Sequence, residues 1–118
     1  MKRDDDLIRQ LLFEFEADDD WIVLSHGDFI SASPEDRRRH YHMLLLADAG
    51  LLAILDDAVF RLTANGHDFL DAIRSDTAWN TAKEGARTIG GATLGLMRDI
   101  ALAYLRKEAA TRLGIALN

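Results

Sequence analysis

The chain opens with apolar residues at helical spacing. They recur at three- and four-residue steps, a pattern typical of a helix that buries one face. The residues that share this spacing are Leu7, Ile8, Leu11, Leu12 and Phe15. Three aspartates fill positions 4–6, where the positive end of the helix dipole favours negative charge. The pattern therefore predicts an amphipathic helix over about 4–17.

Short apolar runs and turn residues follow. The run 21–24 predicts a short strand, 25–28 a turn, and 29–31 a second extended piece. Ser33 can then cap a helix whose first residue is Pro34, because proline has no N–H to lose there. This helix is predicted over 34–49, and Gly50 is expected to end it in the left-handed conformation.

The next segment, 51–62, consists of two apolar runs separated by Asp56 and Asp57, which predicts a tight β-hairpin. Thr63 is expected to cap the following helix, which continues through Ile73. Two more helices are predicted after it. One starts at 76–77, and the other is capped by Thr93, with a break at 89–91 between them.

This order of elements predicts a mainly α (α+β) fold. The expected architecture is a winged helix-turn-helix-like domain with a short β-hairpin wing and additional C-terminal helices. The helix at 34–49 takes the place of the recognition helix. One segment departs from this architecture, because 21–32 shows no helical period where a short second helix is expected. We expect a winged-helix domain at 1–75 and a helical extension at 76–118, packed as a single compact unit.

Composition narrows the class of protein. The 118 residues are 48% hydrophobic and 29% charged, the balance of one folded domain. No apolar run reaches the roughly 18 residues that span a bilayer, and the N-terminus lacks the apolar core of a signal peptide. The chain has no cysteine, which excludes disulfides, thiolate zinc sites and cysteine nucleophiles. We therefore expect an intracellular protein.

Charge is unevenly distributed along the chain. The net charge is −6. Residues 1–36 carry three basic and eleven acidic side chains, a balance of −8, whereas 37–118 carry eleven and nine, a balance of +2. An acidic total weakens non-specific binding to DNA, but a local basic face can still bind it.

One basic cluster lies in the predicted recognition helix. Arg38, Arg39 and His42 are expected to share an exposed helix face. Arginine reads phosphates and guanine edges, and the N-terminal part of a recognition helix enters the major groove. The candidate DNA-binding residues are Arg37, Arg38, Arg39 and His42, with Arg61 in the wing. In the alternative interpretation, this helix face is solvated and its arginines pair with the acidic first helix.

The wing favours a different partner. Its tip carries two carboxylates, which would be repelled by phosphates. An acidic surface of this kind is suited to a basic protein surface instead. The candidate residues for such a protein interaction are Asp18, Asp19, Asp20, Asp56 and Asp57.

The spacing of the residues does not support a metal site or a catalytic triad. His40 and His42 would point about 200° apart on a helix and cannot chelate one metal. The acidic triplets lack the interleaved spacing of a calcium loop. Ser25, His26 and Asp28 are too close in sequence to fold into a catalytic triad. We predict no catalytic residue, no metal and no cofactor.

The last predicted helix suggests self-association. Its apolar residues form more than one stripe, so it must be buried on two sides. The candidate dimer residues are Leu94, Met97, Ala101 and Leu105. We expect a homodimer through this helix. The alternative is that the helix is covered by the core of its own small domain.

Four motifs occur in order along the chain. They are Met-Lys-Arg-Asp-x-Asp-Leu-Ile-Arg at 1–9, Tyr-His-x-x-Leu-x-x-Asp-Ala-Gly-Leu at 41–51, Leu-Thr-x-x-Gly-His-Asp-Phe-Leu-Asp at 62–71 and Asp-Thr-x-Trp-Asn-x-x-Lys-Glu at 76–84. In these motifs the chain resembles the bacterial and phage family catalogued as domain of unknown function 2513. The resemblance implies a winged-helix protein carried largely on phages and prophages, with no catalytic residues. The chain departs from that family in its wing, which is reduced to 52–61.

Two functions follow as hypotheses. The first is a non-catalytic phage or prophage regulator in the cytoplasm of a bacterial host cell, which binds DNA through the helix at 34–49. The second is a phage-encoded inhibitor or adaptor that binds a host protein complex, for example a CRISPR effector, through its acidic surface. A basic helix face favours the first and an acidic wing favours the second. A third and weaker hypothesis is a structural dimer with no ligand of its own.

Overall fold

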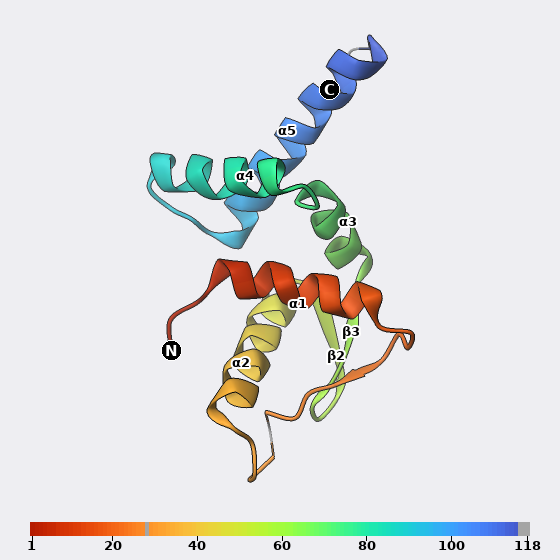
Figure 1. Ribbon diagram of the computed structural model, residues 1–118, viewed down its shortest axis with the longest axis vertical. Coiled ribbons are helices and arrows are strands. Elements are labelled where there is room, and N and C mark those ends of the chain that lie inside the picture. Colours follow the sequence, from red (N-terminus) through yellow and green to blue (C-terminus); the bar gives the residue numbers. More distant parts are fainter. Residues whose placement is uncertain (28, 116–118) are drawn as a thin grey trace. The chain divides into compact units, whose positions relative to one another are not determined.

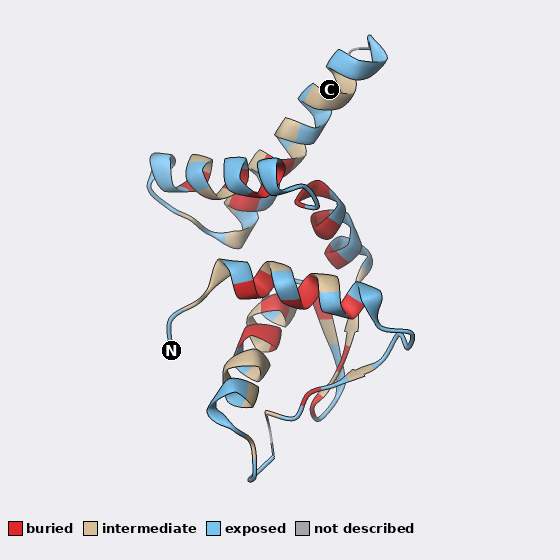
Figure 2. Cartoon of the chain, viewed as in Figure 1, coloured by how far each residue is buried: buried red, intermediate tan, exposed pale blue. Residues whose placement is uncertain are grey.

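The computed structural model describes residues 1–27 and 29–115. The chain divides into two compact units, 1–70 and 71–118. The boundary lies inside helix α3 (Ala64–Ala72), a few residues before the predicted boundary at 75. That the C-terminal helices pack on the first unit stays a prediction. Figure 2 shows buried residues along the helices of both units.

The first unit contains two complete helices and a small sheet (Figure 1). Its elements are α1 (Asp5–Ala17), β1 (Val23–Leu24), α2 (Pro34–Asp48), β2 (Leu52–Asp56), β3 (Val59–Leu62) and most of α3. Over the described residues, the chain has five helices and three strands. The predicted mainly α (α+β) class and the hairpin at 51–62 are confirmed.

One predicted element is wrong. Residues 29–31 form a turn and not a strand. The N–H of Phe29 donates to the carbonyl of His26, and the N–H of Ala32 donates to the carbonyl of Phe29. These short-range bonds use backbone groups that a strand would offer to a neighbour. Residue 28, part of the predicted turn at 25–28, lies outside the described residues.

Side chains fix the ends of the helices, as their sequence predicts. The carboxylate of Asp4 accepts from the backbone of Asp6 and Leu7 at the start of α1. Ser33 and Asp36 form a reciprocal capping box before α2, which satisfies two otherwise unpaired N–H groups. Gly50 follows α2 with a φ of +77°, the left-handed conformation that glycine adopts without steric cost.

The sheet is antiparallel with strand order β1-β3-β2. Val23 pairs with Phe60 and Leu24 with Val59. On the other side of β3, Ala53 pairs with Arg61. Phe60 is buried, and because side chains alternate across a strand, Val59 and Arg61 point to the opposite face. The sheet therefore has an inner face at Phe60 and an outer face at Val59 and Arg61.

The predicted apolar stripe of α1 forms the core of the first unit with parts of α2 and the sheet. α1 contacts α2 and β3, and α2 contacts β2. Burying each such side chain contributes about 1.5–3 kcal/mol. The largest side chains of this core that are fully buried are Ile8, Leu11, Leu12, Leu46 and Phe60.

The second unit is a helical pair, α4 (Asp76–Ile89) and α5 (Leu94–Leu113). Ser75 and Thr93 cap the two helices, and Gly90 ends α4 with a φ of +105°. A Cβ atom at Gly85 would lie 3.2 Å from Cδ1 of Ile100, so the two helices approach closely there. None of the helices in the described residues has a stretch that is long and apolar enough to cross a membrane.

A substitution at Gly66 tests how α3 meets the hairpin. A Cβ atom there would lie 2.2 Å from the carbonyl oxygen of Leu51 and 2.5 Å from Cδ1 of Leu62. We expect Gly66→Ala to lower the free energy of unfolding by about 1–3 kcal/mol, because backbone must shift to admit the methyl group. Urea unfolding would measure this. Asn65→Ala, at an exposed position of the same helix, should change stability by less than about 0.5 kcal/mol. Equal effects of the two substitutions would contradict the close contact.

Candidate functional site

The predicted basic cluster of α2 lies against carboxylates of α1. The guanidinium of Arg39 donates to both carboxylate oxygens of Glu14, at 2.9 and 3.2 Å. Arg38 forms an ion pair with Asp4 and lies 3.8 Å from a carboxylate oxygen of Glu35. Arg37 is exposed. Two of the three arginines thus have intramolecular partners, as the alternative interpretation of this cluster expects.

The Arg39–Glu14 pair has clear electrostatic consequences. The hydrogen bonds donated by Arg39, together with its charge, lower the pKa of Glu14 below 4.5 in spite of partial burial. The hydrogen bonds to Glu14 likewise raise the pKa of Arg39. Both side chains are therefore charged near neutral pH, and each offsets the charge of the other.

His42 is buried between α1 and α2. Its Nε2 atom accepts the backbone N–H of Asp4 at 2.9 Å, and its Nδ1 atom lies 2.8 Å from the carbonyl oxygen of Arg38. A backbone N–H can only donate and a carbonyl can only accept, so the hydrogen of the imidazole is on Nδ1 and the ring is neutral. The expectation that His42 lies on an exposed helix face is wrong, because its side chain is fully buried and ties α2 to the start of α1.

The second histidine of α2, His40, contacts a residue of the preceding loop, a pairing that the sequence pattern does not reveal. Nδ1 of His40 lies 2.7 Å from Oγ of Ser25, and its ring packs edge-on against Phe60. Ser25 is almost fully buried, which closes its hydroxyl to a substrate. A Cβ atom at Gly27 would lie 2.2 Å from Cβ of His40, so a glycine is required where this loop passes α2. The Ser25–His40 contact thus holds the loop before α2 in place.

The acidic candidates lie at two separate places. Asp56 and Asp57 are exposed at the end of the hairpin, as predicted. Asp18, Asp19 and Asp20 are exposed after α1, beside a shallow hollow of about 230 Å³ that is also lined by Leu62 and His67. The ion pairs of the described residues include none of these five carboxylates.

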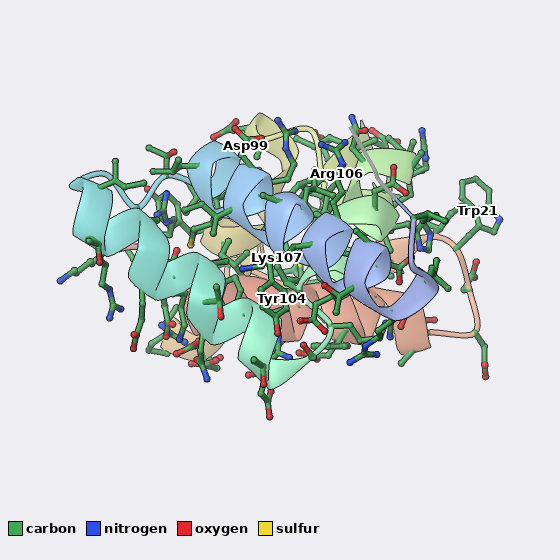
Figure 3. The ribbon with its side chains drawn as sticks, turned by 90° about the horizontal axis from the view of Figure 1, so that it is seen from above. Trp21, Asp99, Tyr104, Arg106 and Lys107 are labelled. Carbon is green, nitrogen blue, oxygen red and sulfur yellow. The ribbon has the colours of Figure 1, made fainter. Side chains whose placement is uncertain are left out.

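Two further side chains, Trp21 and Arg61, lie close in sequence to these acidic residues. Trp21 is 67% exposed, and Figure 3 shows its ring extending away from the chain. Arg61, the basic candidate of the wing, is half-buried on the outer face of the sheet and donates to the carbonyl of its neighbour Leu62 at 3.3 Å. The exposure of Trp21 excludes it from the core, and an exposed tryptophan of this kind can anchor a partner.

The four candidate dimer residues are not equally accessible. Met97 and Ala101 are fully buried, Leu94 is half-buried, and Leu105 is exposed. Two of the four are therefore already covered within this chain. The homodimer stays a prediction. Over residues 1–27 and 29–115, no three His, Asp or Glu side chains are grouped so that they could hold a metal ion.

The two units differ in charge. Residues 1–70 contain seven Lys and Arg and fifteen Asp and Glu, a balance of −8, and 71–118 contain seven and five, a balance of +2. Carboxylates also lie beside three of the basic side chains of the first unit, Arg3, Arg38 and Arg39. The charge that this unit offers to a partner is predominantly negative.

Replacing His42 tests its role as a tie between helices. His42→Leu leaves the N–H of Asp4 and the carbonyl of Arg38 without this partner, so we expect the free energy of unfolding to fall by about 1–3 kcal/mol. His42→Gln keeps an acceptor on a similar side chain and should cost less. Urea unfolding followed by circular dichroism would compare the two. A leucine variant as stable as the wild type would contradict the tie.

The Arg39–Glu14 pair predicts a pH-dependent coupling. Because folding lowers the pKa of Glu14, its contribution to stability is fully present above pH 4.5 and is lost as the pH falls through the lower pKa of the folded state. A double-mutant cycle with Glu14→Gln and Arg39→Met should give about 0.2–1 kcal/mol at pH 7 and nothing in acid. A parallel cycle with Glu14→Gln and Arg37→Met should give no coupling at either pH. Coupling that persists in acid would contradict the ion pair.

The sequence of this chain is similar to those of known proteins. The family model described as "Hypothetical protein (DUF2513)" matches residues 2–93. An uncharacterized protein of Haemophilus influenzae is 33% identical over 110 residues, which cover 84% of this chain and 87% of that protein. No solved structure matches. The resemblance found in the four sequence motifs is thereby confirmed, and the chain belongs to the DUF2513 family.

Proposed function

We propose that this chain is a non-enzymatic, winged-helix-like domain that binds a basic protein surface. The arrangement of the first unit supports the winged-helix part of the proposal. β1 follows α1 and pairs with β3, and the β2–β3 hairpin follows α2 directly. In this proposal, α2 corresponds to the recognition helix and the hairpin to the wing. The loop before α2 takes the place of the usual second helix.

The observation that carries the proposed partner is the distribution of charge. Arg38 and Arg39 are offset within the first unit by carboxylates of α1. The exposed carboxylates after α1 and on the hairpin have no such partners among the described residues. A surface of this kind attracts Lys- and Arg-rich proteins and repels nucleic acid. An inhibitor or adaptor that engages the basic nucleic-acid channel of a host protein complex fits this surface.

DNA binding through α2 is the second candidate. Arg37 is exposed near the start of α2. The ion pair of Arg38 is also partly solvated, with about a third of the Arg38 side chain exposed, and pairs of this kind contribute at most about 1 kcal/mol. A phosphate could therefore compete with Asp4 for Arg38. The two exposed carboxylates at the hairpin tip oppose this candidate.

A binding experiment separates the two candidates. The purified chain would be immobilised and exposed to nuclease-treated bacterial lysate, and bound protein would be eluted with increasing salt. We expect a stoichiometric protein partner that salt releases, because exposed charge pairs are screened. With that partner purified, the double variant Asp56→Asn and Asp57→Asn should slow association by about tenfold, because removing rim charges acts on the association rate.

The control variant also removes two negative charges, but elsewhere on the first unit. Asp48→Asn with Asp68→Asn, both exposed, should leave association within about twofold of the wild type. Absence of any stoichiometric protein partner, together with retardation of duplex DNA in low salt that Arg37→Ala abolishes, would reject the protein-binding function and establish the DNA-binding one.

A further inference from the structure

The outer face of the three-stranded sheet is apolar where water would favour polar residues. In an antiparallel pair, residues directly opposite each other point to the same side. Leu24 of β1 therefore shares the outer face with Val59 of β3, and Ala53 of β2 shares it with Arg61. Leu24 is 50% exposed, so this face is not covered within the chain. A solvated face of an antiparallel sheet usually carries polar side chains, whereas three of the five paired residues on this one, Leu24, Ala53 and Val59, are apolar and only Asp56 and Arg61 are charged.

One further apolar side chain extends this face. Ile22 directly precedes β1, and because side chains alternate along the chain it lies on the same side as Leu24. Ile22 is exposed. Single exposed apolar residues are ordinary, but a contiguous group of them with a polar rim marks an interaction site. We call the set Ile22, Leu24, Ala53 and Val59 the outer sheet face.

Carboxylates lie at both ends of the outer sheet face. At one end, Asp56 pairs directly with Val59, and Asp57 follows it in the turn. At the other end, the backbone N–H of Ile22 donates to the carboxylate of Asp20 at 3.2 Å, and the acidic residues 18–19 directly precede Asp20. Arg61 lies between the two ends and donates to the carbonyl of Leu62. The face is thus an apolar strip with negative charge at each end.

We propose that the outer sheet face is the docking surface for a partner protein that presents an apolar strip with Lys or Arg side chains at both ends. The proposal rests on the basic-protein function proposed above and adds the surface that binds. The apolar centre would supply affinity by removing Leu24 and Val59 from water. The carboxylates at the ends would set the orientation of the partner and speed association.

The charge of the outer sheet face favours a basic protein over a second copy of the chain, DNA or anionic lipid. Two copies of this chain packed face to face would bring carboxylates against carboxylates in either orientation, because both ends of the strip are acidic. The phosphates of DNA and of anionic lipid are repelled for the same reason. Like charges placed opposite each other cost several kcal/mol at an interface. A basic protein removes the repulsion and covers the apolar centre.

Photo-crosslinking from the outer sheet face tests the proposal. The photoreactive residue p-benzoylphenylalanine would be placed at position 24 of the full chain and, in a matched control, at position 30. Ile30 is fully exposed and lies in the loop before α2, off the sheet. If exposed apolar positions crosslinked non-specifically, position 30 would therefore be labelled at least as strongly as position 24. Both variants would be irradiated in nuclease-treated bacterial lysate, and the crosslinked peptides identified by mass spectrometry.

We expect a crosslink from position 24, and none from position 30, to one protein at a peptide that contains Lys or Arg next to apolar residues. With that protein purified, Leu24→Ser should weaken its binding by at least tenfold, and Ile30→Ser should leave it unchanged. Circular dichroism would confirm that both variants are folded. Capture of a protein that does not crosslink from position 24 would not support the outer sheet face as the docking surface.

Three outcomes would overturn the proposal, and they differ in what else they reject. A partner that binds the chain but crosslinks equally from positions 24 and 30, or only elsewhere, rejects the outer sheet face and leaves the basic-protein function standing. A crosslink from position 24 to a second copy of the chain replaces the proposed partner with self-association. No crosslinked or captured protein in any experiment rejects both the docking surface and the proposed function.

Discussion

The arrangement of the first unit depends on the contact between the start of α1 and one side of α2. Asp4 takes part in this contact three times. Its carboxylate caps α1 and pairs with Arg38, and its backbone N–H donates to the buried ring of His42. The imidazole completes the tie by donating to the carbonyl of Arg38. Because His42 has no exposure to water, loss of either hydrogen bond of its imidazole would leave a buried polar group without its partner.

This tie also decides what charge the unit shows to its surroundings. When α1 packs across α2, the carboxylates of Asp4 and Glu14 come to lie against Arg38 and Arg39. The helix that carries three consecutive arginines is thereby offset at two of them. The acidic residues outside this contact, in the segment after α1 and on the hairpin, stay exposed. The charge that the first unit exposes is thus a consequence of how its helices pack.

Much of the fold could be predicted from residue patterns. The stripe of α1, the Ser33–Pro34 helix start, the hairpin around Asp56 and the cap at Thr93 all depend on neighbours in sequence, and each was found as expected. The failures involve contacts between residues far apart in sequence. His42 has the polarity of a surface residue, and only its bond to Asp4, 38 residues away, makes it part of the core. The contact between Ser25 and His40 was missed for the same reason.

The irregular pairing of β2 between Ile54 and Asp56 has a consequence for solubility. β2 is an edge strand with two exposed apolar side chains, and a regular edge of this kind is a template on which further strands of other molecules can add. An extra residue in the strand breaks the even spacing of its backbone N–H and carbonyl groups and increases its local twist. The irregularity therefore makes this edge a poorer template for strand addition, although the edge carries exposed apolar side chains.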